Sequence, residues 1–276
     1  MKTYLLFNVK SLLILIILGL CSSCENIHKE KDGVNRVKSI IIKLTDRTTN
    51  KTSKQVIHYN YDKDSQLAKI DISNEIDNGY QDQHFICQWN NQTLLINNQT
   101  EPAKQVQYTF SEGHIFSQKD QSSSIMYSYE DMYLEHIQES ENIYCNFMWN
   151  NRRVDSVTCK EGKTTTTIKY IYKNPTIYSH GAHLALRLDP LQMAYPEMFG
   201  LNTIEVPYAV DVQEMNEEDA RNIHYSYGYE FDASGLISKM RINKTVQSGK
   251  IKQGKVIYTS THQTHEEWNI SWTYLP

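Results

Sequence analysis

The sequence predicts an all-β protein, built as an antiparallel hairpin meander of about 14 to 16 strands that curls into a barrel or half-barrel. Three observations support this prediction. A five-residue pattern with strand periodicity recurs along the chain, turn residues follow its copies, and the composition favours strands. The 276 residues include 19 Tyr and 7 Phe but only 11 Gly and 6 Pro, and aromatic residues are enriched in strands.

The recurring pattern places apolar or aromatic residues at its first, third and fifth positions. Successive side chains of a strand point to opposite faces, so the three residues of each copy share one face. We expect this face to form the core, together with Trp89, Trp149, Trp268 and Trp272. The copies are residues 57–61, 85–89, 106–110, 125–129, 145–149, 168–172, 227–231 and 270–274.

Residues typical of tight turns follow the copies, as at residues 62–65 and 232–235. Asp, Asn, Ser and Gly favour turns because they tolerate left-handed geometry or bond their own backbone. A second apolar set then appears, such as Leu67, Ile70 and Ile72, which predicts the returning strand of a hairpin. A meander of this length accumulates twist, so it cannot remain a flat open sheet.

The pattern stops between about residues 174 and 223, which predicts one mostly non-strand insertion. Within it, residues 184–200 are apolar but contain Pro190 and Pro196, so they allow at most a short helix beginning near Asp189. Residues 216–222 are polar and predict a loop or a second helical turn. The insertion has two interpretations: a plug that buries the open end of the curled sheet, or a loop that contacts a ligand.

The N-terminus predicts export and lipidation. A basic stretch precedes an apolar run, residues 11–20, which suits a secretory signal and is too short to span a bilayer. The run ends in Leu-Cys-Ser-Ser-Cys at residues 20–24, which resembles a bacterial lipobox. That resemblance implies a lipid-modified cysteine. Cys24 follows two small serines and fits better than the alternative, Cys21, which follows bulky Leu20.

These features predict three segments: a lipoprotein signal peptide at residues 1–23, a flexible tether at 24–38, and a single β domain at 39–276. The tether is polar and charged, as flexible linkers are. A plain signal peptide with incidental cysteines is the remaining alternative for the N-terminus.

Parts of the repeat resemble the YD repeats of wall-associated bacterial proteins, in which Tyr-Asp precedes a glycine turn. The nearest matches are residues 61–62 and 231–235. The whole plan, with a lipobox, aromatic hairpins and a closing Trp-Thr-Tyr at residues 272–274, is similar to a family of uncharacterised Bacteroidetes lipoproteins. Those proteins have a porin-like β fold and no assigned activity. The resemblance implies an outer membrane lipoprotein that faces either the periplasm or the cell surface.

The chemistry-bearing residues form no recognisable catalytic motif. The net charge is −4 with 22% charged residues, so there is no basic excess and we expect no nucleic-acid partner. The histidine pairs His180/His183 and His262/His265 lack the spacing of a zinc-protease helix, and residues three apart on a strand point to opposite faces. The sequence therefore assigns no catalytic, cofactor-binding or metal-binding residue.

Three cysteines lie in the predicted β domain: Cys87, Cys145 and Cys159. Cys145 and Cys159 fall on adjacent predicted strands and would form a disulfide in an oxidising compartment. The simple hairpin register does not place them directly opposite each other. We therefore favour three small buried side chains, with the disulfide as the alternative.

These observations favour a lipid-anchored envelope protein without catalytic activity, which binds or scaffolds a glycan or a protein. The alternative is an envelope glycan or peptidoglycan hydrolase that uses paired carboxylates, although the sequence selects no such pair. A barrel that spans the membrane itself is disfavoured by the lipid anchor and by the low mean hydropathy of the chain.

Overall fold

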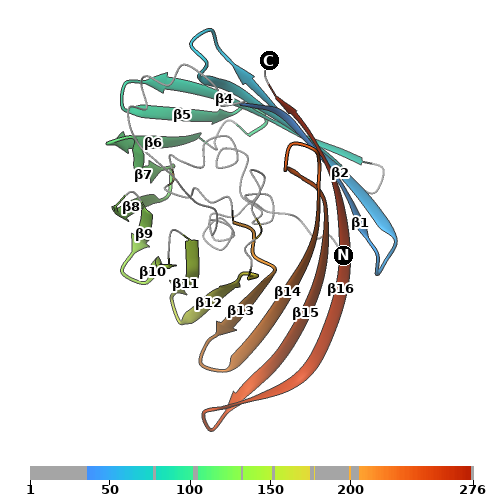
Figure 1. Ribbon diagram of the computed structural model, residues 1–276. Helices are drawn as coiled ribbons and strands as arrows, with labels where there is room; N and C mark the ends of the chain where they lie inside the picture. Colours follow the sequence, from blue (N-terminus) through green and yellow to red (C-terminus); the bar gives the residue numbers. More distant parts are fainter. Residues whose placement is uncertain are drawn as a thin grey trace.

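The protein is a closed barrel of sixteen antiparallel strands in which every strand pairs with its neighbours in sequence, and β1 closes onto β16 (Figure 1). The computed structural model describes residues 36–76, 79–101, 105–131, 133–150, 153–174, 177, 199 and 205–274. The predicted all-β meander is confirmed, and it forms a full barrel. The predicted signal peptide and the two candidate lipidation cysteines lie outside the described residues.

The strands differ in length around the barrel. We call β5 to β13 the short wall and β14 to β16 the tall wall; β1 to β4, with 10 to 12 residues, are intermediate. Strands β5 to β13 have six to nine residues each, whereas β14, β15 and β16 have 13, 16 and 20. The bounds are β1 Val37–Asp46, β2 Lys51–Tyr61, β3 Leu67–Ile76, β4 Gly79–Asn90, β5 Thr93–Asn98, β6 Gln105–Ser111, β7 His114–Lys119, β8 Ser124–Glu130, β9 Tyr133–Ser140, β10 Ile143–Asn150, β11 Arg153–Glu161, β12 Thr164–Ile171, β13 Ala209–Met215, β14 Asp219–Phe231, β15 Ile237–Lys252 and β16 Lys255–Tyr274.

The barrel has two different rims. Odd-numbered strands begin, and even-numbered strands end, at the rim that also holds the start of β1 and the end of β16; we call it the terminal rim. The hairpin turns at the opposite, distal rim join each odd strand to the next even strand. Because β15 and β16 are so long, the tall wall projects well beyond the short wall at the distal rim (Figure 1).

The repeated aromatic face points into the barrel, as the alternation predicts. Ile57 and Tyr59 are fully or almost fully buried, and their outward neighbour His58 is exposed. The same alternation continues around the barrel, so the buried hydrophobic residues of all the strands form one cluster. Trp268 belongs to that cluster, and Trp89, Trp149 and Trp272 pack against it. The predicted core position of all four tryptophans is thus observed.

The insertion is shorter than the sequence predicts. Strand β13 and the first residues of β14 lie within residues 174–223, and they continue the meander. The polar segment at 216–222 is a hairpin turn followed by strand: the side-chain amide oxygen of Asn216 accepts hydrogen bonds from the backbone N–H groups of Glu218 and Asp219. The sequence prediction of a loop or a second helical turn is therefore wrong for residues 219–222. The acidic, polar composition of the turn hides the short alternation in which Ala220 is buried and Arg221 is exposed. The helix predicted near Asp189 lies outside the described residues.

The described residues at the end of the insertion belong to the core. Phe199 is 2% exposed and meets the ring of Tyr108 edge to face, with the centroids 6.1 Å apart. Val206 is fully buried, and its backbone N–H donates to the carbonyl of Ile177 at 3.0 Å. These contacts agree with the interpretation of the insertion as a plug.

The two cysteines that we favoured as free thiols are bonded: Cys145 on β10 and Cys159 on β11 form a disulfide. The expectation failed because of a bulge. The β10–β11 register shifts by one residue between Met148 and Trp149, which places Cys145 directly opposite Cys159. Without that extra residue Cys159 would face away from the core, since a shift of one residue exchanges the two faces of a strand.

Candidate functional site

The terminal rim carries a repeated structural feature that the sequence pattern did not reveal. Near the end of an even-numbered strand, an aromatic side chain donates a hydrogen bond to a backbone carbonyl at the start of the preceding odd-numbered strand. We call these contacts rim clasps. Among the described residues there are seven: Tyr61 to Val37, Trp89 to Leu67, Tyr129 to Ile115, Trp149 to Leu134, Tyr172 to Val154, Tyr229 to Pro207 and Trp272 to Ile237.

The rim clasps bridge strands whose backbones have separated. Strands β7 and β8 pair only between residues 117–119 and 124–126, near the distal rim. At the terminal rim the phenol of Tyr129 donates to the carbonyl of Ile115 at 2.8 Å, where a ladder hydrogen bond would otherwise lie. On β6 the equivalent residue is Phe110, which has no donor and instead stacks on Trp89, with the centroids 5.7 Å apart. The aromatic repeat therefore has a structural role at this rim.

Burial keeps the clasp phenols protonated. Desolvation raises the pKa of Tyr129 and of Tyr172 far above the ordinary value of a tyrosine. A neutral phenol is a hydrogen-bond donor, as the clasp requires.

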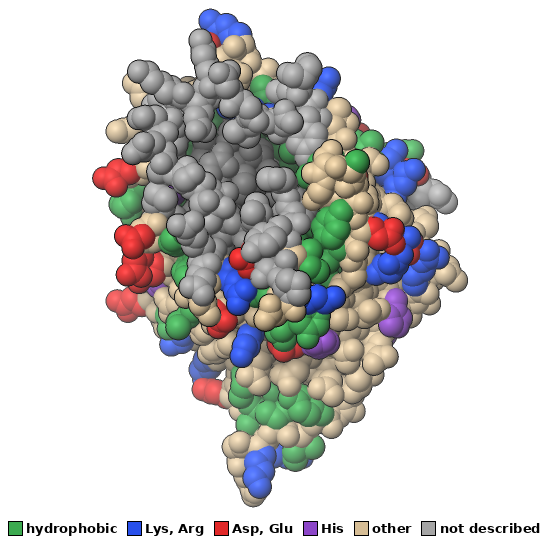
Figure 2. All heavy atoms as spheres, viewed as in Figure 1, with side chains coloured by type: hydrophobic (Ala, Val, Ile, Leu, Met, Phe, Trp, Pro, Cys, Tyr) green, Lys and Arg blue, Asp and Glu red, His purple; other side chains and the backbone are tan. Residues whose placement is uncertain are grey.

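The outer face of the barrel is polar and charged, and Figure 2 shows basic and acidic side chains scattered around the periphery of the molecule. His84 on β4 lies 2.6 Å from the carboxylate of Asp71 on β3, and His224 on β14 lies 2.6 Å from that of Asp211 on β13. A barrel that spans a bilayer has the reverse arrangement, with an apolar band outside and a polar interior.

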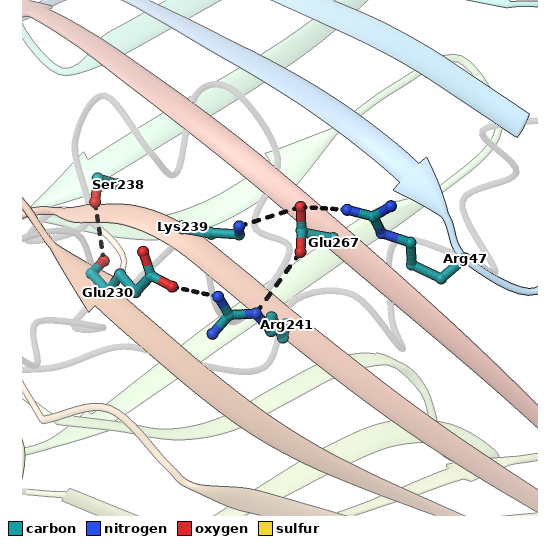
Figure 3. A network of polar contacts seen from close by, with 6 residues as sticks. All are labelled: Arg47, Glu230, Ser238, Lys239, Arg241 and Glu267. Atoms are coloured by element: carbon teal, nitrogen blue, oxygen red, sulfur yellow. Dashed lines mark hydrogen bonds and ion pairs between the residues drawn. The ribbon is translucent and has the colours of Figure 1, made fainter. Parts of the chain in front are cut away.

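A charge network crosses the closing seam of the barrel on this outer face (Figure 3). Its centre is Glu267 on β16, whose carboxylate contacts Arg47 at 2.9 Å and Lys239 at 3.2 Å. Arg241 on β15 approaches the same carboxylate at 3.6 Å and also pairs with Glu230 on β14. The network links β1, β16, β15 and β14, so it reinforces the junction of the first and last strands.

A small cleft of about 230 Å³ opens at the distal rim among β12 to β15, and two carboxylate side chains, Glu214 and Asp219, line it. Glu214 pairs with Arg221 at 3.2 Å, and Asp219 pairs with Lys250 at 2.7 Å. Each carboxylate of the cleft is thus held by a cation.

The histidines that the sequence singled out are not brought together. His180 and His183 lie outside the described residues. His262 and His265 are both on β16, opposite Val246 and Asn243 of β15, and the ring of His265 is bonded to the side chain of Asn243 at 2.7 Å. Within the described residues no group of three or more His, Cys, Asp or Glu side chains has the arrangement of a metal site.

The comparisons with known proteins identify the fold. A crystal structure of a porin-like protein from Bacteroides uniformis superposes with a TM-score of 0.60 at 14% sequence identity, over 86% of this chain and 98% of that one. The two proteins share a fold. No protein-family model and no curated protein sequence matches the chain. No helix within the described residues is long and apolar enough to cross a membrane.

Proposed function

We propose that this protein is a lipid-anchored, non-catalytic barrel of the cell envelope, which stands in water and binds or scaffolds a glycan or protein. The observation that carries the proposal is the polarity of the two faces. Inward side chains such as Ile57 and Ile137 are buried and apolar, while the outer face carries the Glu267 network and the His–Asp pairs. Placing those charges against lipid would cost several kcal/mol, on the order of 2–4 for one exposed cation at the bilayer midplane.

The cysteine chemistry supports export. Disulfides persist in oxidising compartments such as the periplasm and the cell surface, and Cys145–Cys159 is such a bond. The remaining described cysteine, Cys87, is buried, and this burial raises the pKa of its thiol to about 12. A thiol that stays protonated reacts poorly, so Cys87 does not compete for the disulfide.

The proposed anchor is a lipid on Cys24, with Cys21 as the alternative. About a dozen residues separate Cys24 from the start of β1, and an extended chain of that length reaches roughly 40 Å. Two or more acyl chains hold a protein stably on a bilayer. The porin-like description of the structural neighbour from Bacteroides uniformis is compatible with an envelope location, and we propose that this barrel lies beside the membrane.

The anchor is tested by labelling cells with radioactive palmitate and then fractionating them. We expect Cys24→Ser to abolish labelling and to release the full chain as a soluble protein without detergent, while Cys21→Ser remains labelled. Loss of labelling in Cys21→Ser alone would assign the lipid to Cys21. An unlabelled Cys24→Ser protein that still needs detergent for extraction would show that the barrel enters the bilayer, and the polarity argument would be wrong.

The hydrolase alternative has less support than the binding protein. The two carboxylates that line the distal cleft, Glu214 and Asp219, are both ion-paired. Release of soluble fragments from peptidoglycan by the purified protein, and its loss in Glu214→Gln, would favour the hydrolase.

A further inference from the structure

The barrel is closed over only part of the height of β16. Pairing between β1 and β16 runs from Val37 opposite Tyr274 down to Asp46 opposite Glu266. The chain then turns away into β2, while β16 continues for another ten residues, 255–264, which pair with β15 alone. No other described strand pairs with this stretch, and in Figure 1 it forms the outer margin of the tall wall below β1. We call residues 255–264 the free edge.

Among the described residues, one side of the free edge has no strand to pair with. At its upper end, the N–H of His265 donates to the hydroxyl of Thr48, and its carbonyl accepts from the N–H of Arg47. Backbone groups alternate between the two sides of a strand, so those of Gln263 and Thr261 point to the same side as those of His265. Below Arg47 that side has no described strand. A row of open N–H and C=O groups is a template for another strand.

Most of the free edge lacks the side chains that usually block edge pairing; the exception is Lys255 at its lower end, and the edge also contains one bulge, at Thr259. Residues 256–264 contain no Lys, Arg, Asp, Glu or Pro, although natural edge strands are commonly protected by such residues. Two large apolar side chains lie here in water: Ile257 is 49% exposed and Tyr258 is 41% exposed. The composition is rich in Thr, Ile, Val and Tyr, which favour strands.

We propose that the free edge is a docking site for the free edge of a second copy of this chain, in an antiparallel two-fold pair. When residues 255–264 of the two copies are aligned antiparallel to each other, Lys255 of one copy faces Thr264 of the other. In the same register Ile257 faces His262, and Tyr258 faces Thr261. The alignment uses the whole free edge and ends next to His265, which Arg47 covers. No like charges become opposite, and both exposed apolar side chains gain a neighbour.

A bulge in β16 makes this register consistent. Between Ser260 and Tyr258 the β15–β16 pairing shifts by one residue, with Thr259 as the extra residue. In the two-fold alignment Ser260 of one copy faces Thr259 of the other, so the bulges of the two copies coincide at the axis. Such an interface is isologous, with the same surface used by both subunits.

The pairing is compatible with the proposed lipid anchor but does not depend on it. Antiparallel edges place the two terminal rims at opposite ends of the pair. A tether that reaches roughly 40 Å lets both copies attach to one bilayer when their long axes lie along it. Cross-linking can therefore contradict the pairing while palmitate labelling confirms the anchor, and labelling can contradict the anchor while cross-linking confirms the pairing.

Site-specific cross-linking of the full chain in cell membranes tests the pairing. We expect Ser260→Cys, which lies at the two-fold axis, to yield a disulfide-linked dimer on mild oxidation. The matched control is Asn269→Cys, exposed on the same strand where β1 covers the edge, and it should remain monomeric. Equal cross-linking at both positions, or none at Ser260→Cys, would overturn the proposal.

A charge exchange separates loss of pairing from loss of folding. In the Ser260→Cys background, Ile257→Lys with His262→Lys places like charges opposite each other and should reduce the dimer several-fold. Ile257→Lys with His262→Glu places opposite charges there and should restore it. Insensitivity to both pairs would contradict the register. A cross-link only to a protein of another mass would show that a different partner occupies the edge, which also overturns self-pairing.

Discussion

Arg47, the residue after β1, forms an ion pair at 2.9 Å with Glu267 of β16, 220 positions later in the sequence. This contact lies where the first and last strands meet, and the same carboxylate also binds Lys239 and Arg241 (Figure 3). Closing a barrel between distant strands carries a loop-closure cost that only contacts at the seam can offset.

We expect Glu267→Gln to lower the urea midpoint of unfolding at neutral pH. Burial alone raises the pKa of the Glu267 carboxyl, but hydrogen bonds from Arg47 and Lys239 outweigh it and hold that pKa below the ordinary value. A carboxyl with a lowered folded-state pKa stabilises the protein above its unfolded pKa of about 4.3, and the contribution disappears as the pH falls through the folded value. The difference between wild type and variant should therefore shrink on acidification below that value.

The control for this prediction is Glu217→Gln. Glu217 also pairs with a cation, Lys163, but both side chains are more than two-thirds exposed. Exposed pairs contribute little, so the midpoint should not change. Equal effects of the two substitutions would mean that the seam network has no special role.

The rim clasps should contribute measurably to stability. Tyr129→Phe removes only the hydroxyl that bonds the carbonyl of Ile115, and we expect a loss of about 1 kcal/mol in the free energy of unfolding. Tyr80→Phe removes the same group from a side chain that is 73% exposed and should leave stability unchanged. Chemical denaturation of the two variants makes the comparison, and an unaffected Tyr129→Phe protein would show that water replaces the clasp.

Two equivalent turns differ at one position, and this difference predicts a stabilising substitution. Asp62 and Asp232 make the same backbone hydrogen bonds, and the left-handed residue is Ser65 in the first turn, at φ 60°, and Gly235 in the second, at φ 79°. A non-glycine residue is strained there. Ser65→Gly should stabilise by about 0.5–1 kcal/mol, whereas Ser234→Gly, at the neighbouring position without a positive φ, should not. Thermal unfolding distinguishes these outcomes.

The Cys145–Cys159 bond should stabilise the barrel by about 3 kcal/mol, the value expected for a loop of this length, since 14 positions separate the two cysteines. A reductant should lower the melting temperature of the wild type, but not that of the double variant Cys145→Ala/Cys159→Ala. A wild-type melting temperature that does not respond to complete reduction would rule out a stabilising role.

The all-β fold and the two faces of each strand were predictable because they depend on local order. Alternation assigns Ile57 and Tyr59 to the core irrespective of the strands that flank them. The Asp62 and Asp232 turns are equally local, since each Asp side chain bonds the backbone of its own turn. Cys24 was likewise inferred from its immediate neighbours, and it stays a prediction because it lies outside the described residues.

Register, closure and the free edge were decided only by the tertiary structure. A bulge in β11, where Asp155 is the extra residue, places Cys145 opposite Cys159, and nothing in the local pattern marks that residue. The strand at Ala209–Met215 was missed because its sequence lacks the aromatic repeat. The free edge exists because β16 extends beyond the end of β1. The two strands lie at opposite ends of the chain, so this difference in length leaves an uncovered strand edge only once the barrel closes and places them side by side.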